Sequence, residues 1–177
     1  MVQPERENRS SEFVDRVALG QQTFELGKPA DLTLHRKVEP ERHTADVGGV
    51  LYDIIKLRSY AETLPTETVS LELLRGHVEP GHKYWIDEKG GFLGPAEILK
   101  NWNDAQANPL WKTHVAAIRN SNLDQPIWMT RSGIVFDGMH RLTKAFVEGV
   151  KDIKVKVFDV IPEFAVADNP ADAQRSS

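Results

Sequence analysis

The chain has 177 residues, which by ordinary domain sizes is one domain with room for an extra arm at either end. Its 40% hydrophobic and 27% charged residues are typical of a globular protein and exclude a fibrous or wholly disordered chain. The absence of cysteine excludes disulfides, a thiol nucleophile and thiolate metal sites, and a net charge of −4 offers nucleic acid no overall attraction.

Both ends of the chain are polar, and we expect residues 1–12 and a tail over 163–177 to be flexible. Between them the composition predicts a partly flexible N-terminal arm over 1–47, to which we assign no chemistry, and one packed domain over 48–162. No stretch reaches the roughly 18 apolar residues of a membrane span, and the N-terminus lacks the form of a signal peptide. The sequence therefore predicts a cytoplasmic protein without a membrane partner.

The first half of the predicted domain contains three helical patterns and one alternating pattern. Apolar residues recur at helical spacing over Val50–Leu64, and alternation then predicts a strand over Thr66–Leu74. Proline and glycine residues predict mainly loop over Arg75–Gly94. Two more helices are expected, over Pro95–Asp104 and Pro109–Arg119.

The second half predicts a strand, a tight turn, a strand, a helix and a closing strand. The first strand is Pro126–Thr130, the turn contains Gly133, and the second strand is Ile134–Phe136. The helix ends at Gly149, and apolar residues alternate over Ile153–Phe158. Together the elements predict an α+β fold in which a small mixed sheet packs with helices.

The residues at the junction between the second strand and the helix favour a phosphate. Helix N-termini attract anions, Gly138 allows close approach to the backbone, and Arg141 supplies a planar fork of donors. His140 and Lys144 lie four residues apart on one helical face beside Arg141. The alternative is structural: Asp137 caps the helix, Gly138 eases the turn, and the basic side chains are solvated surface charges.

The same segment resembles the ParB/sulfiredoxin-like superfamily over about Thr66–Phe158. It is similar in particular to bacterial proteins with an Asp-Gly-Met-His-Arg motif and to the free serine kinases of this fold. The resemblance implies a ParB/sulfiredoxin-like core with an N-terminal extension. The superfamily includes CTP-binding partition proteins, nucleases, sulfinic acid reductases and kinases, so it constrains function less than fold. The matching positions are Pro126-Ile127, Gly133, Ile134-Val135-Phe136, Asp137-Gly138-x-His140-Arg141-x-x-Lys144-Ala145, Gly149 and Ile153-x-Val155-x-Val157.

Carried over to this chain, the Gly-x-x-Arg box of the superfamily falls on Gly138 to Arg141 and implies contacts with nucleotide phosphates. The sulfiredoxin-like branch has its nucleophilic cysteine where this chain has Met139, whose thioether cannot form a thiolate. The kinase-like branch has an acidic residue near a His-Glu box. The nearest match to this box in the chain is Gly76-His77-Val78-Glu79, in which Val78 separates the histidine from the glutamate. The resemblance therefore makes Glu79 a candidate base.

These residues predict a nucleotide-binding enzyme that transfers or hydrolyses a phosphoryl group, with a small hydroxyl-bearing acceptor such as serine. Phosphoryl transfer requires cations on the phosphates and a carboxylate that orients or deprotonates the acceptor. Asp137, His140 and Glu79 are the predicted catalytic residues, and Asp137 or Glu79 is the expected base or magnesium ligand. ATP, ADP or CTP with Mg²⁺ is the expected cofactor. The predicted nucleotide-binding residues are Gly138, Met139, His140, Arg141 and Lys144.

Two other classes of function remain open. One is a ParB-like DNA-associated binding or nuclease module. The net negative charge and the lack of a helix-turn-helix segment argue against it. The other is a non-catalytic interaction protein that senses a nucleotide. A zinc site at His77, Glu79 and His82 is disfavoured by its spacing. The tryptophans, including Trp128, are interpreted as core or interface residues rather than platforms for bases.

Overall fold

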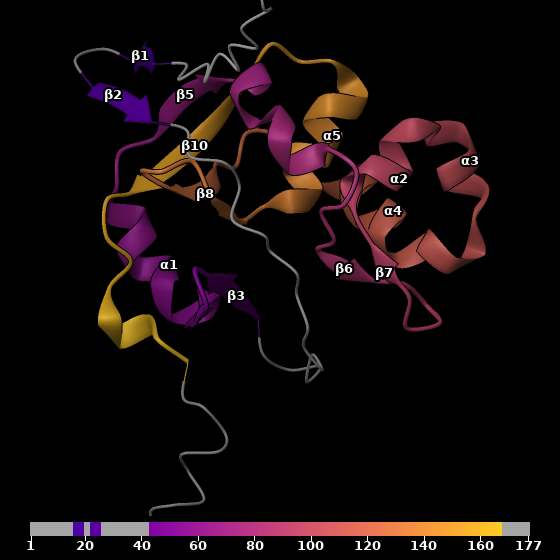
Figure 1. The fold of residues 1–177 in the computed structure, drawn as a ribbon, viewed down its shortest axis with the longest axis horizontal. Coiled ribbons are helices and arrows are strands. Elements are labelled where there is room, and N and C mark those ends of the chain that lie inside the picture. The colour runs from indigo at the N-terminus through magenta and orange to yellow at the C-terminus, as the bar shows by residue number, and fades with distance from the viewer. Residues whose placement is uncertain (1–15, 20–21, 26–42, 168–177) are drawn as a thin grey trace, which may run out of the picture.

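The computed structural model describes residues 16–19, 22–25 and 43–167 (Figure 1). The two short segments are strands β1 (Arg16–Leu19) and β2 (Gln22–Glu25), which pair antiparallel. The remainder of the predicted arm up to residue 42, including the predicted flexible segment 1–12, lies outside the described residues, as does the predicted tail from residue 168.

A four-stranded mixed sheet forms the centre of the fold, in the order β5-β10-β8-β9. Strand β10 (Asp152–Phe158) pairs antiparallel with β5 (Glu67–Ser70) and parallel with β8 (Ile127–Thr130). Strand β8 pairs antiparallel with β9 (Val135–Asp137). The predicted α+β class is therefore confirmed, whereas the ParB/sulfiredoxin-like core remains a prediction.

Glycines set both ends of the helix that follows β9. This helix, α5 (Met139–Glu148), starts after Gly138 and ends at Gly149, and both glycines have left-handed backbones, with φ of 94° and 65°. A Cβ atom on Gly138 would lie 2.7 Å from Cγ2 of Ile127. The chain thus turns from strand to helix with its backbone pressed against β8, and only glycine fits there without strain.

Alternation along β10 directs its side chains to two different faces of the sheet. Ile153, Val155 and Val157 pack in one core with α5 and the helices beside it, whereas Phe158 belongs to a second core. Figure 1 shows these helices grouped on one side of the sheet, away from α1. The elements on this side besides α5 are η1 (Leu71–Val78), β6 (Trp85–Ile86), β7 (Phe92–Leu93), α2 (Pro95–Lys100), α3 (Trp102–Ala107), η2 (Pro109–Trp111) and α4 (Lys112–Asn120).

The second core lies between the sheet and α1 (Ile54–Thr63). Helix α1 contributes Ile54, Leu57 and Ala61, and the sheet contributes Phe136 and Phe158. The hairpin of β3 (Thr44–Val47) and β4 (Val50–Asp53) and the short helix η3 (Glu163–Ala165) complete this side. Because β3 lies beside β9, the residue before β3 comes close to the end of the central hairpin.

The predicted helix over Val50–Leu64 is wrong in its first turn. Residues Val50–Asp53 form β4, because they pair with β3 across a turn at the two glycines that precede them. The helix begins only after Asp53, whose Oδ1 accepts hydrogen bonds from the backbone N–H groups of Ile55 (2.8 Å) and Lys56 (3.2 Å). Local apolar spacing alone did not distinguish an edge hairpin from a helical turn.

Other predicted boundaries also shift. Strand β5 ends at Ser70 and is followed by the 3₁₀ helix η1, and the predicted loop contains the β6–β7 hairpin. The predicted helix over Pro95–Asp104 is divided at Asn101, whose Oδ1 caps the start of α3. The predicted helix over Pro109–Arg119 begins as the 3₁₀ helix η2.

The ends of the predicted domain also take part in the packing. The boundary at residues 47 and 48 falls inside the β3–β4 hairpin, and Ala165, beyond residue 162, is fully buried against the α1 core. Tyr52 forms an isolated bridge with Val166. Within the part of the chain that the structure describes, no helix has the length and apolar character needed to cross a bilayer.

Candidate functional site

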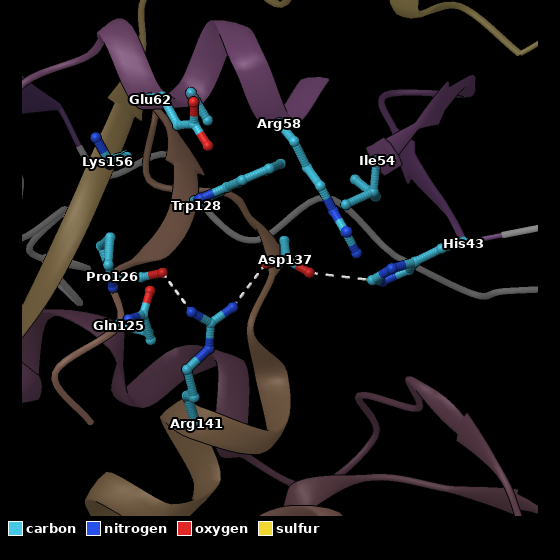
Figure 2. A pocket seen from close by; sticks show the side chains of 11 residues that line it. His43, Ile54, Arg58, Glu62, Gln125, Pro126, Trp128, Asp137, Arg141 and Lys156 are labelled. Atoms are coloured by element: carbon cyan, nitrogen blue, oxygen red, sulfur yellow. Dashed lines mark hydrogen bonds and ion pairs between the residues drawn. The ribbon is translucent and has the colours of Figure 1, made fainter. Parts of the chain in front are cut away.

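A pocket of about 350 Å³ lies between α1 and the sheet face that α1 covers. This volume is at the lower end of the range for small-molecule sites. Figure 2 shows that Arg58 and Glu62 extend from α1 towards the pocket. Asp137, at the end of β9, and Arg141, in the first turn of α5, lie below them. Lys156, from β10, lines the same pocket.

Asp137 and Arg141 form a largely buried ion pair in the pocket. Nη2 of Arg141 donates to Oδ2 of Asp137 at 2.7 Å, and Nη1 donates to the carbonyl oxygen of Pro126 at 2.6 Å. The side chain of Arg141 is only 20% exposed and that of Asp137 only 13%. Arg141 therefore ties the loop before β8 to the end of β9, and the two predicted site residues lie side by side.

The structural alternative, in which Asp137 caps α5, does not describe this geometry. Among the described residues, the carboxylate of Asp137 has Arg141 and His43 as its partners, and no backbone N–H group of α5 donates to it. Position N-cap is held by Gly138, which has no side chain to cap the helix.

His43 is a pocket residue that sequence reasoning missed. Its Nε2 lies 3.5 Å from Oδ1 of Asp137, and its carbonyl oxygen accepts a hydrogen bond from the backbone N–H of Ile54 at 2.9 Å. His43 precedes β3, in the arm to which the sequence analysis assigned no chemistry. No local pattern marks it, because its position depends on β3 lying beside β9.

Arg58 and Glu62 are also pocket residues without a sequence motif. They lie one turn apart on α1, and neither forms an ion pair or hydrogen bond with another residue in the described part of the chain. Lys156, in contrast, donates from Nζ to the carbonyl oxygen of Leu64 at 2.6 Å and so holds the end of α1 against the sheet. The pocket thus contains a guanidinium and a carboxylate that are available to a ligand.

His140 faces away from the pocket. Its ring stacks on Trp85 at 4.6 Å between centroids and an interplanar angle of 2°, and its Nε2 lies 3.1 Å from Nδ1 of His114. Nε2 of His114 lies 2.8 Å from the carbonyl oxygen of Ile86 and donates to it, because a carbonyl oxygen only accepts, so Nδ1 is the nitrogen that faces His140. His140 is therefore part of an aromatic stack that includes Trp85 of β6.

Burial is the main reason that the pKa of His140 is lowered to about 4. Repulsion from His114, from the neighbouring Arg141 and from His43 lowers this pKa further. His140 was predicted to be a catalytic and phosphate-binding residue. In the structure it contacts Trp85 and His114 instead and does not line the pocket.

The other predicted site residues also lie outside the pocket lining. Nζ of Lys144 donates to the carbonyl oxygens of Arg119 (3.1 Å) and Ser121 (2.7 Å) at the end of α4. Met139 is buried in the core on the α5 side. Glu79 is exposed after η1. Of the predicted set, the pocket brings together Asp137 and Arg141.

His77 has a structural environment rather than that of a metal ligand. Its Nε2 lies 2.8 Å from the carbonyl oxygen of Gly133, and its Nδ1 lies 3.2 Å from the hydroxyl of Tyr84. Both ring nitrogens are therefore used: Nε2 joins η1 to the turn between β8 and β9, and Nδ1 joins it to the residue before β6. Burial lowers the pKa of His77, although the hydrogen bond to Gly133 opposes that shift.

Comparisons with protein-family models, with curated proteins and with solved structures found no match to the chain. Three basic side chains line the pocket, from α1, α5 and β10, together with His43 and two carboxylates. This composition suits an anionic ligand that also has groups able to bind carboxylates.

Proposed function

We propose that the chain is a nucleotide-binding enzyme that holds the phosphates of ATP, ADP or CTP in the pocket between α1 and the sheet. The single observation that supports this proposal most is the convergence of Arg58, Arg141 and Lys156 on one pocket from three separate elements. Guanidinium groups match phosphate oxygens in shape and charge, and a lysine adds a point charge.

The cations have different parts in this proposal. Arg58 has no partner within the described residues, so its whole guanidinium is available to a phosphate. Arg141 is already held by Asp137 and Pro126, which fixes its plane and leaves its remaining N–H groups as oriented donors. A fixed donor costs less ordering entropy when the ligand binds. Positive charge arranged in this way also stabilises the charge that spreads over a phosphoryl group during transfer.

Asp137 is the proposed base for the reaction, which transfers a phosphoryl group to a small hydroxyl acceptor such as serine or to water. Its carboxylate lines the pocket between Arg141 and His43, and it would accept the proton of the attacking hydroxyl. The bond between the terminal phosphorus and its bridging oxygen would break, and the nucleotide with one phosphate fewer would leave with the electron pair of that bond. Glu79 is exposed and does not line the pocket, so it has no part in the proposed reaction.

The pocket residues also fit the Mg²⁺ ion that this chemistry implies. Magnesium is held in phosphoryl-transfer enzymes by one or two carboxylates together with phosphate oxygens. Asp137, the pocket carboxylate that pairs with Arg141, would hold the ion. When bound, it would neutralise phosphate charge, while Arg58 and Arg141 orient the phosphates.

Calorimetric titration of ATP, ADP and CTP with Mg²⁺ tests the proposal. We expect binding to the unaltered chain and at least tenfold weaker binding to Arg58→Gln, because this exposed helical residue can change without disturbing the core. Lys154→Ala is the matched control, since Lys154 lies two residues before Lys156 on β10 but pairs with Asp124 outside the pocket. Failure of all three nucleotides to bind would overturn the proposal.

A further inference from the structure

We propose that Trp128 is the platform on which the base of the nucleotide stacks, and that Glu62 accepts a hydrogen bond from an amino group on that base. This inference rests on the proposed function and assigns the base to the α1 side of the pocket and the phosphates to the side near Arg141. Figure 2 shows Trp128 and Glu62 near each other under α1, while Arg141 lies farther from α1.

Trp128 is held in place by two aromatic rings of the α1 core. Its ring lies 5.7 Å from Phe158 at 45° and 6.4 Å from Phe136 at 63°, and those two rings meet each other at 5.0 Å and 74°. These are tilted and edge contacts, which anchor an indole without covering its face with a parallel ring. The orientation of Trp128 is therefore set before a ligand arrives.

Trp85 provides the contrast within the same protein. Two imidazoles stack on its ring, His140 at 2° and His114 at 16°. Trp85 is buried, whereas Trp128 is partly exposed and lines the pocket, and within the described part of the chain no ring lies parallel to it. A planar base would provide the parallel partner that Trp128 lacks.

Glu62 gives the pocket a preference for bases that have an amino group. A carboxylate only accepts hydrogen bonds, and Glu62 has no donor among the described residues. The amino groups of adenine and cytosine are donors, whereas the corresponding position of uracil is a carbonyl oxygen that a carboxylate would repel. The inferred ligand is therefore a nucleotide whose base has an exocyclic amino group.

Calorimetry with two probes, ATP and inorganic triphosphate, each with Mg²⁺, tests the platform separately from the phosphate site. We expect the unaltered chain to bind ATP at least tenfold more tightly than triphosphate, because stacking on an aromatic side chain adds affinity of this order. Trp128→Leu should abolish this preference and leave triphosphate affinity unchanged, which also shows that the variant is folded. Trp128→Phe should keep most of the preference, and Trp102→Leu, outside the pocket, should keep all of it.

The outcomes distinguish the two proposals. Equal affinity for ATP and triphosphate in the unaltered chain, or an undiminished preference in Trp128→Leu, would overturn the platform and leave the phosphate site intact. Binding of neither probe would overturn the proposed function and this inference together. For Glu62, CTP should bind more tightly than UTP, and Glu62→Gln should reduce that ratio, because an amide also donates. An unchanged ratio would overturn the role of Glu62.

Discussion

Arg141 and Asp137 are joined across one turn at the start of α5, with Nη2 of the arginine 2.7 Å from Oδ2 of the aspartate. The other terminal nitrogen of Arg141 donates to Pro126, so one side chain connects the strand that precedes the helix with the loop that precedes β8. The pair is largely buried and lines the pocket. It therefore links the stability of the fold to the shape of the proposed site.

Arg141→Ala should lower the free energy of unfolding by about 2–4 kcal/mol, because it leaves the carboxylate of Asp137 largely buried without its main partner and removes a donor from Pro126. Urea unfolding followed by circular dichroism measures this change. Asp124→Asn is the control: it breaks the exposed pair with Lys154 and should leave stability close to that of the unaltered chain. Equal effects of the two substitutions would show that the Arg141 pair has no special structural role.

Gly138→Ala should destabilise the protein by about 2–4 kcal/mol, because the new Cβ would meet Ile127 at 2.7 Å and the residue keeps a left-handed backbone. Gly90→Ala separates the two causes. Gly90 also has positive φ, at 84°, but a Cβ there meets nothing within 4 Å, so its substitution should cost only the backbone strain of about 1 kcal/mol. Urea unfolding of both variants measures the difference. A cost at Gly138 no larger than at Gly90 would contradict the close approach to β8.

Stability should fall as the pH is lowered from about 6.5 towards 4. The pKa of His140 is depressed to about 4 in the folded chain, so between these values the unfolded chain binds a proton that the folded chain does not. The expected loss between pH 7.5 and pH 5 is about 2 kcal/mol from His140. Urea unfolding at the two pH values measures it.

His140→Gln identifies the source of this pH dependence. The variant should lose most of the decrease and keep a smaller part from His77, whose pKa is also lowered by burial. A variant that retains the full decrease between pH 7.5 and pH 5 would show that His140 is not the responsible group.

Asp137→Asn should reduce turnover by at least about 100-fold while nucleotide binding changes by only a few fold, because the amide still accepts a hydrogen bond from Arg141 but cannot act as a base. Release of phosphate from ATP, and its transfer to serine, are the measurements. Glu79→Gln should leave turnover unchanged, since Glu79 is exposed and does not line the pocket. Turnover that survives in Asp137→Asn and is lost in Glu79→Gln would move the base from β9 to the segment after η1.

Local patterns predicted the central elements well. Gly133 and Gly149 marked a turn and a helix end, and alternation marked β10. These features depend on residues within a few positions of one another, so their physical cause lies within the pattern itself. The first turn of the predicted helix at Val50 was wrong because pairing with β3, which the pattern does not include, makes that segment a strand.

Some features of the candidate site also depend on neighbouring residues in the sequence, whereas others depend on tertiary packing. The sequence placed Asp137 and Arg141 in one site because they lie four residues apart at a junction between strand and helix, but it did not predict the ion pair that they form. The rest of the site depends on how α1, β3 and the β6–β7 hairpin pack on the sheet. This packing decides which side of the fold His140 faces, brings His43 close to Asp137, and places Arg58 and Trp128 in one pocket. Such contacts join residues far apart in the chain, and the burial of both faces of the sheet selects them, so no short spacing encodes them.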